Sequence, residues 1–415
     1  METTSSSPFG PDDCNPELSD YSLMGCVLFE GYSDDARHFL WSFLTLLETI
    51  SLFLNPATIP LCVLGIVFSL FHFAVLAQKS MRTSSANIIL LGIVLCDIFS
   101  LLNIIKAFGF PFYSKGTKCT PPPTVSALRV SFTIDACLAG FRRSTTFLGV
   151  LLASIRYLAV RFFMISERFT RPRTGVLAII ASLLLSAVFA FISWQQVEVK
   201  ILTTHDKNGT LVNRTWTSDE TCDVQHNETP MVVVDSDDAF FGSGDTLLTT
   251  FTFWNGLISK IIPAFLFPIL SVLLLVELAK TKSSRNHATT GEGPRKDRTT
   301  VLILLMTISF MIVEIPLGIV IGVESLLADD DPGGVLMILT QLSLVWNLVY
   351  ILNSTFHFLL CFGLSVQYRE TASEVIRAPF RKRGNRIEDG SFSGDRSQSN
   401  PSSTLHRFRG RHSTS

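Results

Sequence analysis

Long apolar runs recur along the chain and are separated by shorter polar segments. Seven runs are long enough to cross the roughly 30 Å hydrocarbon core of a bilayer as helices, at residues 57–78, 86–110, 124–160, 174–198, 247–279, 299–327 and 335–362. The pattern therefore predicts an all-α membrane protein, a bundle of seven transmembrane helices. A further apolar run at residues 38–54 is interrupted by Glu48 and followed by Asn55-Pro56, which predicts a separate surface helix that ends there.

The third run differs from the others because it carries charged residues. Asp135, Arg142 and Arg156 are separated by seven and fourteen positions, which places them on one face of a helix. Ionisable side chains inside a membrane span are costly and normally face the bundle interior. A buried helix of a soluble protein could show the same stripe, but six comparable runs surround this one. We therefore interpret residues 124–160 as the central helix of the bundle.

Composition agrees with a membrane protein and excludes several other classes. Hydrophobic residues make up 47% of the chain and charged residues 17%, against roughly 25% in soluble domains. The net charge of −1 gives no reason to expect a nucleic-acid partner. The sequence contains no His/Cys cluster with metal-ligand spacing, and its spans contain no nucleophile–base pair, so we expect no metal, no cofactor and no enzyme. A light-driven retinal protein would need a Lys in the last span, which has none.

Basic residues at the ends of the runs predict the orientation. Loops rich in Lys and Arg alternate with loops that have few, and the basic loops are the cytoplasmic ones. The basic set is Lys79, Arg82, Arg161, Arg168, Arg171, Arg173, Lys280, Lys282, Arg285, Arg295, Lys296 and Arg298. This places the N-terminus outside a multi-pass plasma-membrane protein. Three glycosylation sequons agree, because Asn208, Asn213 and Asn227 fall in one loop that this orientation puts outside.

The orientation divides the chain into four segments. Residues 1–56 are expected to form an extracellular tail, and residues 57–362 the helix bundle. Residues 363–380 have an apolar and a basic face, typical of a short helix lying on the lipids of the anionic inner leaflet. Residues 381–415 are rich in Ser, Arg and Gly and are expected to be a disordered cytoplasmic tail, either a phosphorylation substrate or a solvating segment.

Cysteines on the predicted outer side suggest disulfide bonds. Cys119 precedes the third span and Cys222 lies in the glycosylated loop, so both meet the oxidising compartment. We predict a disulfide between them that holds the long loop over the mouth of the bundle. Whether Cys14 also pairs with Cys26 is left open.

Several short motifs occur in a fixed order along the runs. The motifs are Asn87 with Asp97 ten positions later, Ser154-Ile-Arg156-Tyr157, Pro268, Pro316 and Asn353-Ser-Thr-Phe-His357. With them the chain resembles the rhodopsin-like G-protein-coupled receptors. Further motifs are Lys79-Ser-Met-Arg-Thr-Ser-Ser-Ala-Asn87, Phe141-Arg-Arg-Ser-Thr, Asp297-Arg-Thr-Thr, Glu314-Ile-Pro-Leu-Gly318 and Gln367-Tyr-Arg369. They make residues 57–380 similar to the serpentine class-W (Srw) receptors of nematodes, a class that resembles the FMRFamide and myosuppressin receptors.

This resemblance implies how the chain would signal. An extracellular ligand would rearrange the bundle, and Arg156 and Tyr157 would help to receive a heterotrimeric G protein, with arrestin and a receptor kinase as further partners. Ile155 stands where relatives have an acid before that Arg, so the usual acid–Arg restraint of the inactive state is missing. The switch positions implied by the resemblance are Asp97, Thr145, Pro316, Asn353 and His357.

The role of the Asp97 group remains open at this point. In many relatives the positions of Asp97, Thr145 and Asn353 cradle a sodium ion. A nearby Arg could neutralise Asp97 instead, or the three side chains could simply hydrogen-bond to one another.

Ligand chemistry is suggested by charge and by the resemblance. The N-terminal tail and second outer loop are acidic, which would attract a cationic peptide, although acids also keep an extracellular surface soluble. We expect an amidated, FMRFamide-like neuropeptide, with a small environmental molecule sensed by a chemoreceptor as the alternative. The candidate ligand-binding residues are Arg142, Glu314, Lys260, Asp135 and Trp346.

Glu314 occupies a position where most relatives have Trp, two residues before the proline of the sixth helix. Arg142 corresponds to the third-helix position that packs against it. Because an unpaired charge at this depth would cost several kcal/mol, we predict an Arg142–Glu314 ion pair, with Arg143 or Lys260 as the competing partner of Glu314. The pair would serve as a latch that ligand rearranges, or as a static bridge.

Overall fold

The computed structural model describes residues 28–29, 31–109, 123–162, 166–195, 198–201, 203–205, 211–213, 215–216, 229–230, 232–235, 253–286, 295–327 and 334–388. The chain divides into two compact units, Met1–Thr371 and Ala372–Ser415. The first unit contains the helix bundle and all the sites discussed below.

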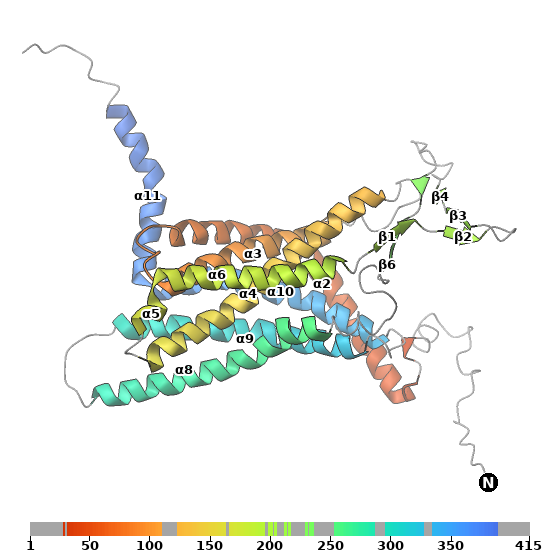
Figure 1. Ribbon diagram of the computed structural model, residues 1–415, viewed down its shortest axis with the longest axis horizontal. Coiled ribbons are helices and arrows are strands. Elements are labelled where there is room, and N and C mark those ends of the chain that lie inside the picture. Colours follow the sequence, from red (N-terminus) through yellow and green to blue (C-terminus); the bar gives the residue numbers. More distant parts are fainter. Residues whose placement is uncertain are drawn as a thin grey trace, which may run out of the picture. The chain divides into compact units, whose positions relative to one another are not determined.

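Within the described residues, seven long helices form the bundle (Figure 1). They are α2 (Asp34–Leu76), α3 (Ser85–Gly109), α4 (Val125–Arg161), α6 (Pro172–Gln195), α8 (Ile262–Asn286), α9 (Arg295–Leu327) and α10 (Gly334–Leu364). A short helix α5 (Ser166–Thr170) joins α4 to α6, and a π-helical turn η4 (Leu257–Ile261) leads into α8. Each long helix overlaps the greater part of one of the seven predicted spans, which confirms the predicted seven-helix fold. Residues 247–252 of the fifth predicted span lie outside the described ranges.

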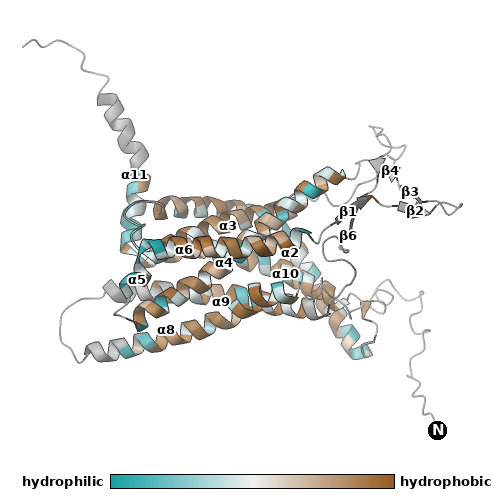
Figure 2. Ribbon diagram, in the orientation of Figure 1, coloured by the Kyte–Doolittle hydropathy of each residue, from teal (hydrophilic) through white to brown (hydrophobic). Residues whose placement is uncertain are grey.

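The apolar surface of these helices suits a bilayer. Five helical segments are long and apolar enough to cross a membrane, namely α2, α3, α6, Phe253–Glu277 and α10. Helix α9 contains a shorter apolar stretch, Leu304–Val320. Helix α4 is long enough to cross a membrane, but its polar residues make it less apolar than these five segments. Large apolar side chains such as Phe53, Leu177 and Phe265 are exposed on the outside of the bundle, and Figure 2 shows hydrophobic residues predominating along the helices. Lipid contact explains this exposure.

Helix α4 occupies the centre of the packing, as predicted. It packs against α3, α6, α8 and α9, whereas α10 packs against α2 and α9. Its buried residues include Arg143, Ser144, Thr145 and Thr146, so the most polar helix faces other helices. Polar groups therefore meet one another inside the bundle, as the cost of exposing them to lipid requires.

The predicted end of a surface helix at Asn55 is wrong. Helix α2 continues through Pro56 and Pro60, although each proline lacks the N–H that would bond the carbonyl four residues earlier. Membrane helices tolerate proline where neighbouring helices support the segment, and α2 packs against α3 and α10. The outer part of α2 is also held by packing: Leu44 and Leu47 form a buried cluster with Phe29 and with Ile338 of α10.

The described residues between α6 and η4, in the loop predicted to be outside, include six short strands. They form three antiparallel pairs: β1 (Glu198–Ile201) with β6 (Val232–Asp235), β2 (Thr203–His205) with β3 (Leu211–Asn213), and β4 (Thr215–Trp216) with β5 (Thr229–Pro230). Asn213 ends β3, whereas the other two sequons, Asn208 and Asn227, lie outside the described residues. So do Cys14, Cys26, Cys119 and Cys222, and both disulfides and all glycosylation stay predictions.

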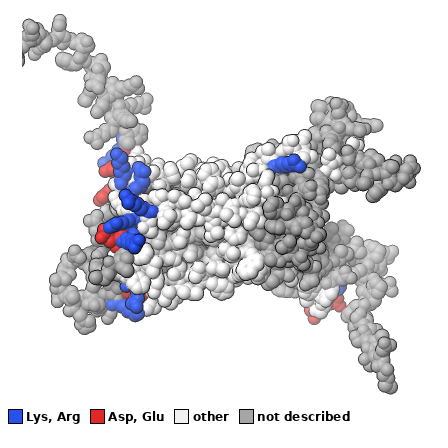
Figure 3. Space-filling model, viewed as in Figure 1, with Lys and Arg blue, Asp and Glu red and all other residues white. Residues whose placement is uncertain are grey.

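Basic side chains gather at one end of the bundle, beside α5 (Figure 3). The loop between α2 and α3 meets the beginning of α11 (Val366–Glu388) there: Gln367 donates to the Ser80 carbonyl (2.9 Å), and the Ser80 and Thr371 hydroxyls are 3.3 Å apart. This agrees with the cytoplasmic side predicted from the loops. Helix α11 also runs eight residues beyond the expected end at residue 380, and residues 389–415 lie outside the described ranges.

Candidate ligand site and intramembrane polar core

A buried ion pair joins the fifth and sixth spans. Lys260 ends the buried part of η4, and its Nζ lies 3.1 Å from Oε2 of Glu314 on α9. The two side chains are 8% and 2% exposed. A π-helical turn adds a residue to the helical repeat and so changes which side chains face inward. The turn thereby brings Lys260 close to Glu314, which lies on α9 two residues before Pro316.

Arg142 points to a different partner. Its Nη1 donates to Oδ1 of Asn347 (2.8 Å), and its guanidinium lies over the Tyr350 ring, 4.5 Å from the ring centroid. Both contacts are with α10, so the predicted Arg142–Glu314 pair is wrong and the competing Lys260–Glu314 pair is correct. The Nε and Nη2 atoms of Arg142 are buried and make no hydrogen bond within the described part of the chain.

Two other side chains singled out from the sequence, Trp346 and Arg143, lie around this level of the bundle. Trp346 donates from its indole nitrogen to the Val313 carbonyl (3.0 Å), which ties α10 to α9 beside Glu314. Arg143 turns to the opposite side of α4, where Nη1 approaches the Ser186 carbonyl (3.5 Å), so it does not compete for Glu314. Arg142 and Arg143 nevertheless act electrostatically on Lys260, which makes the interior rich in positive charge.

Asp135 lies apart from the buried pair. Its Oδ1 is 2.6 Å from Nζ of Lys106 on α3, and its side chain is about half exposed. Lys106 also donates to the Ser131 carbonyl (2.9 Å). Sequence reasoning missed this partner, although Lys106 is a charged residue within an otherwise apolar span and could have been noticed for that reason. Asp135 therefore occupies the outer part of α4 as one half of a partly solvated ion pair.

The carboxylate of Asp97 accepts hydrogen bonds from three described hydroxyl groups. Thr145 and Tyr350 donate to Oδ1 (3.2 and 3.1 Å), and Ser354 donates to Oδ2 (3.3 Å). The predicted contact with Thr145 is confirmed. Asn353 is buried, but the hydrogen bonds described for Asp97 do not include it, and Ser354 takes that place. Sodium binding here stays a prediction.

Aromatic side chains link the Asp97 group to α8. Nδ1 of His357 is 3.8 Å from Oδ2 of Asp97, too long for a hydrogen bond, and its ring centroid lies 4.6 Å from that of Phe310. Phe310 stacks in turn with Phe267 at 5.8 Å. Gly149 allows this stack to approach α4, because a Cβ there would lie 3.0 Å from the Phe267 ring. A continuous buried path therefore joins α10, α9 and α8.

At the cytoplasmic end, α4 contacts α8 through charge. Nη1 of Arg161 donates to Oε1 of Glu277 at 2.6 Å, and Lys280 lies 3.5 Å from the other carboxylate oxygen. Arg156 is partly buried one and a half turns earlier, and its Nε makes no hydrogen bond within the described ranges. Ile155 is buried beside it. Among the described residues at this end of α4, the arginine that pairs with an acid is therefore Arg161, whereas in relatives the acid–Arg restraint involves the position of Arg156.

The beginning of α11 is held against α2. The Tyr368 hydroxyl is 2.7 Å from Nδ1 of His72, and both side chains are buried. Burial raises the pKa of Tyr368 above its ordinary value, so the hydroxyl stays neutral. This contact holds the first turn of the predicted amphipathic helix against the first span.

The family model described as serpentine type 7TM GPCR chemoreceptor Srw matches residues 57–379, which include the second part of α2 and the whole of α3, α4, α6, α8, α9 and α10. The chain belongs to this family. No curated protein matches it. The Srw protein is accordingly a multi-pass plasma-membrane receptor that responds to an extracellular ligand and has a G protein as its partner. The match gives no support to the narrower likeness to FMRFamide receptors.

In this Srw receptor the polar groups form three levels along the bundle. The outer level contains Asp135 with Lys106, the middle level the Lys260–Glu314 pair and the Asp97 group, and the inner level the Arg161–Glu277 pair. Among the described residues, no group of three His, Cys, Asp or Glu side chains is placed to hold a metal ion. The middle level is the candidate site at which ligand binding and helix rearrangement meet.

Proposed function

We propose that this Srw receptor is activated by an amidated, FMRFamide-like neuropeptide that reaches the middle level of the bundle. The proposal rests on two nitrogens of Arg142, Nε and Nη2, that have no hydrogen-bond partner in the described part of the chain, together with a buried carboxylate on Glu314. An unpaired buried donor costs about 1–3 kcal/mol, so a ligand that supplies an acceptor removes that cost.

The end of an amidated Arg-Phe peptide carries both groups that such a site needs. Its terminal carboxamide oxygen would accept from Nε or Nη2 of Arg142, and its amide nitrogen would donate to a neighbouring oxygen. Its arginine side chain would compete with Lys260 for Glu314, because a guanidinium forms two parallel hydrogen bonds to a carboxylate where an ammonium acts as a point charge. Displacement of Lys260 would loosen η4 from α9 and so start the rearrangement.

A second candidate is a small acidic molecule detected by a chemoreceptor. Arg142 and Arg143 both act electrostatically on Lys260, the partner of Glu314, and an anionic ligand would offset this positive charge. The family description, which names chemoreceptors, also favours this candidate. Such a ligand would pair with Arg142 and leave the Lys260–Glu314 pair in place.

One panel of ligands separates the two candidates. Cells expressing the receptor are exposed to a peptide ending in Arg-Phe-amide, to the same peptide as a free acid, and to small carboxylates, and G-protein dissociation is measured. The peptide proposal predicts a response to the amide and a response at least about tenfold weaker to the acid, because a carboxylate costs more to desolvate and has no N–H to donate. A response to small carboxylates alone would favour the second candidate.

Substitution of Arg142 tests whether the response uses the proposed site. Arg142→Met should abolish the response to the amidated peptide at unchanged surface expression. Arg129→Met is the matched control, because Arg129 lies on the same helix but is exposed. Equal responses of the two variants would contradict the assignment of Arg142.

A further inference from the structure

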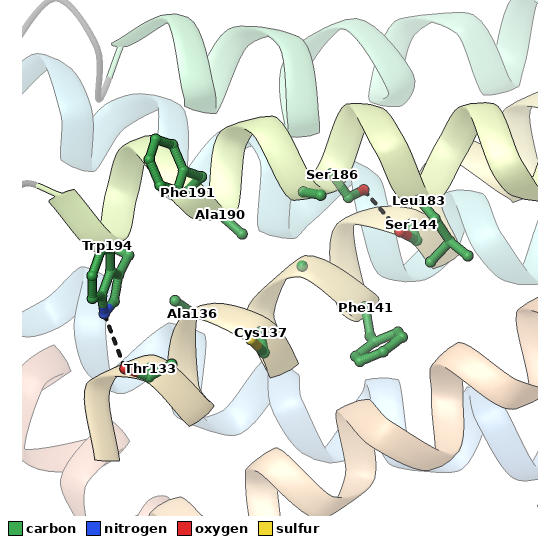
Figure 4. A pocket seen from close by; sticks show the side chains of 12 residues that line it. Thr133, Ala136, Cys137, Phe141, Ser144, Leu183, Ser186, Ala190, Phe191 and Trp194 are labelled. Carbon is green, nitrogen blue, oxygen red and sulfur yellow. Dashed lines mark hydrogen bonds between the residues drawn. The ribbon is translucent and has the colours of Figure 1, made fainter. Parts of the chain in front are cut away.

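A cavity of about 560 Å³ lies between the outer halves of α4 and α6, on the side of α4 away from Lys260 and Glu314. Figure 4 shows it between the two helices, with side chains from Thr133 to Ser144 on α4 and from Leu183 to Trp194 on α6. The volume falls within the roughly 300–1,000 Å³ typical of sites for small molecules. The twelve residues from Thr133 to Ser144 span about 16 Å of helix, close to half of a bilayer's hydrocarbon core.

The cavity opens to the bilayer, and its mostly apolar lining combines small residues with the larger Phe141, Leu183, Phe191 and Trp194. Ala136 and Gly140 on α4 face Ala187 and Ala190 on α6, and none of the lining residues is charged. Cys137 and Ala187 are exposed on the lipid-facing side. Four side chains of at most one carbon leave broad, flat walls, which suit a rigid planar molecule better than a branched one. Absence of charge among the lining residues disfavours an ionic ligand.

Hydrogen bonds close the two ends of the cavity in different ways. At the inner end Ser144 donates to the Ser186 hydroxyl (2.8 Å), and both serines are buried. At the outer end the exposed Trp194 indole donates to the Thr133 hydroxyl (3.0 Å), while Thr133 donates to the Arg129 carbonyl (2.8 Å). The inner pair is shielded. The outer pair is accessible, so the Trp194 indole N–H can donate to the oxygen of another molecule in place of Thr133. A ligand with one polar end would therefore place it near Trp194, at the depth where tryptophans meet the membrane interface.

From these features we propose that the cavity binds a sterol from the outer leaflet. The rigid ring system lies against the small residues of α4 and α6, and the single hydroxyl accepts from Trp194. A rigid ring system loses less conformational freedom on binding than a flexible acyl chain of the same size. A sterol also spans about one leaflet, in keeping with the length of the cavity.

A molecule bound in the cavity would affect the position of Arg142 at the candidate ligand site. Phe141 lines the cavity and stacks on Phe99 of α3, with ring centroids 4.4 Å apart. The next residue of the same helix is Arg142. A bound sterol therefore fixes the position of the α4 segment that carries Arg142, and sterol content tunes the response to whatever ligand the receptor takes.

The test uses the full-length receptor in nanodiscs and a photoreactive sterol, without any agonist, so its outcome is independent of the proposed peptide ligand. Crosslinks should map to the α4 and α6 peptides that line the cavity, and excess unlabelled sterol should remove them. Ala187→Phe should reduce labelling at least about fivefold, because its ring fills the cavity. Val188→Phe, exposed on the same helix but outside the lining residues, should not.

Two further arms decide between a sterol and ordinary lipid. Sterol should slow the alkylation of Cys137 by a membrane-permeant thiol reagent relative to sterol-free nanodiscs. Removal of the sterol hydroxyl, or the substitution Trp194→Phe, should weaken labelling about three- to tenfold, as expected for one lost hydrogen bond. Equal labelling by a photoreactive phosphatidylcholine, or labelling that Ala187→Phe leaves unchanged, would overturn the proposal.

Discussion

Breaking the Lys260–Glu314 pair from one side should destabilise the receptor far more than removing it completely. At the observed 3.1 Å and an effective dielectric constant of about 20, the Coulomb attraction is about 5 kcal/mol. Removal of one partner from a buried pair costs about 3–5 kcal/mol, because the remaining charge stays buried without compensation. Lys260→Met and Glu314→Leu should therefore each lower the apparent melting temperature of the purified receptor, by roughly 6–12 °C. The double variant, which buries no charge, should lie close to the wild type.

The partly exposed Lys106–Asp135 pair provides the control for this cycle. Its side chains are 23% and 45% exposed, so the same substitutions, Lys106→Met and Asp135→Leu, should show a coupling below about 1 kcal/mol. Melting of all variants is followed by intrinsic fluorescence in one detergent. Additive effects of Lys260→Met and Glu314→Leu, or a coupling no larger than that of the control pair, would refute the reasoning from burial.

Three other predictions concern signalling at the cytoplasmic end. Arg156→Ala should reach the surface and bind ligand but fail to activate G protein; unchanged activation at equal expression would remove the role assigned to it. Ile155→Asp should lower ligand-independent G-protein activity by restoring an acid beside Arg156, and no fall in measurable basal activity would show that this restraint is not needed. Glu277→Gln should raise basal activity several-fold by weakening the contact of Arg161 with α8, whereas an unchanged basal level would assign that ion pair to structure alone.

The helical architecture could be predicted because membrane spans leave a strong sequence signal. Seven apolar runs of sufficient length predict seven helices, and the charged residues of α4 identify it as the helix that must face its neighbours. The end of the helix at Asn55 could not be predicted in the same way. Proline often ends helices in water, but packing of α2 against α3 and α10 allows this helix to continue.

The partners inside the candidate site were harder to predict, for geometric reasons. A regular helical period gives no sign of the π-turn that brings Lys260 to Glu314. On α10, Tyr350 and Ser354 are four positions apart and share a face, whereas Asn353 lies about 100° from Ser354, and the Asp97 carboxylate accordingly bonds the first two. The long side chain of Arg142 reaches Asn347 and Tyr350, one turn apart, in preference to α9.

If Glu314 receives the cation of a peptide ligand, removal of that cation should weaken the response only while Glu314 carries its charge. Concentration–response curves for G-protein dissociation are measured with an Arg-Phe-amide peptide and with its citrulline analogue, which is neutral and of similar shape, on the wild type and on Glu314→Gln. The account predicts a loss of potency of about 10- to 100-fold for citrulline on the wild type, since tenfold corresponds to about 1.4 kcal/mol, and nearly equal potencies on Glu314→Gln. An undiminished response to the citrulline peptide, or the same loss on both receptors, would contradict it.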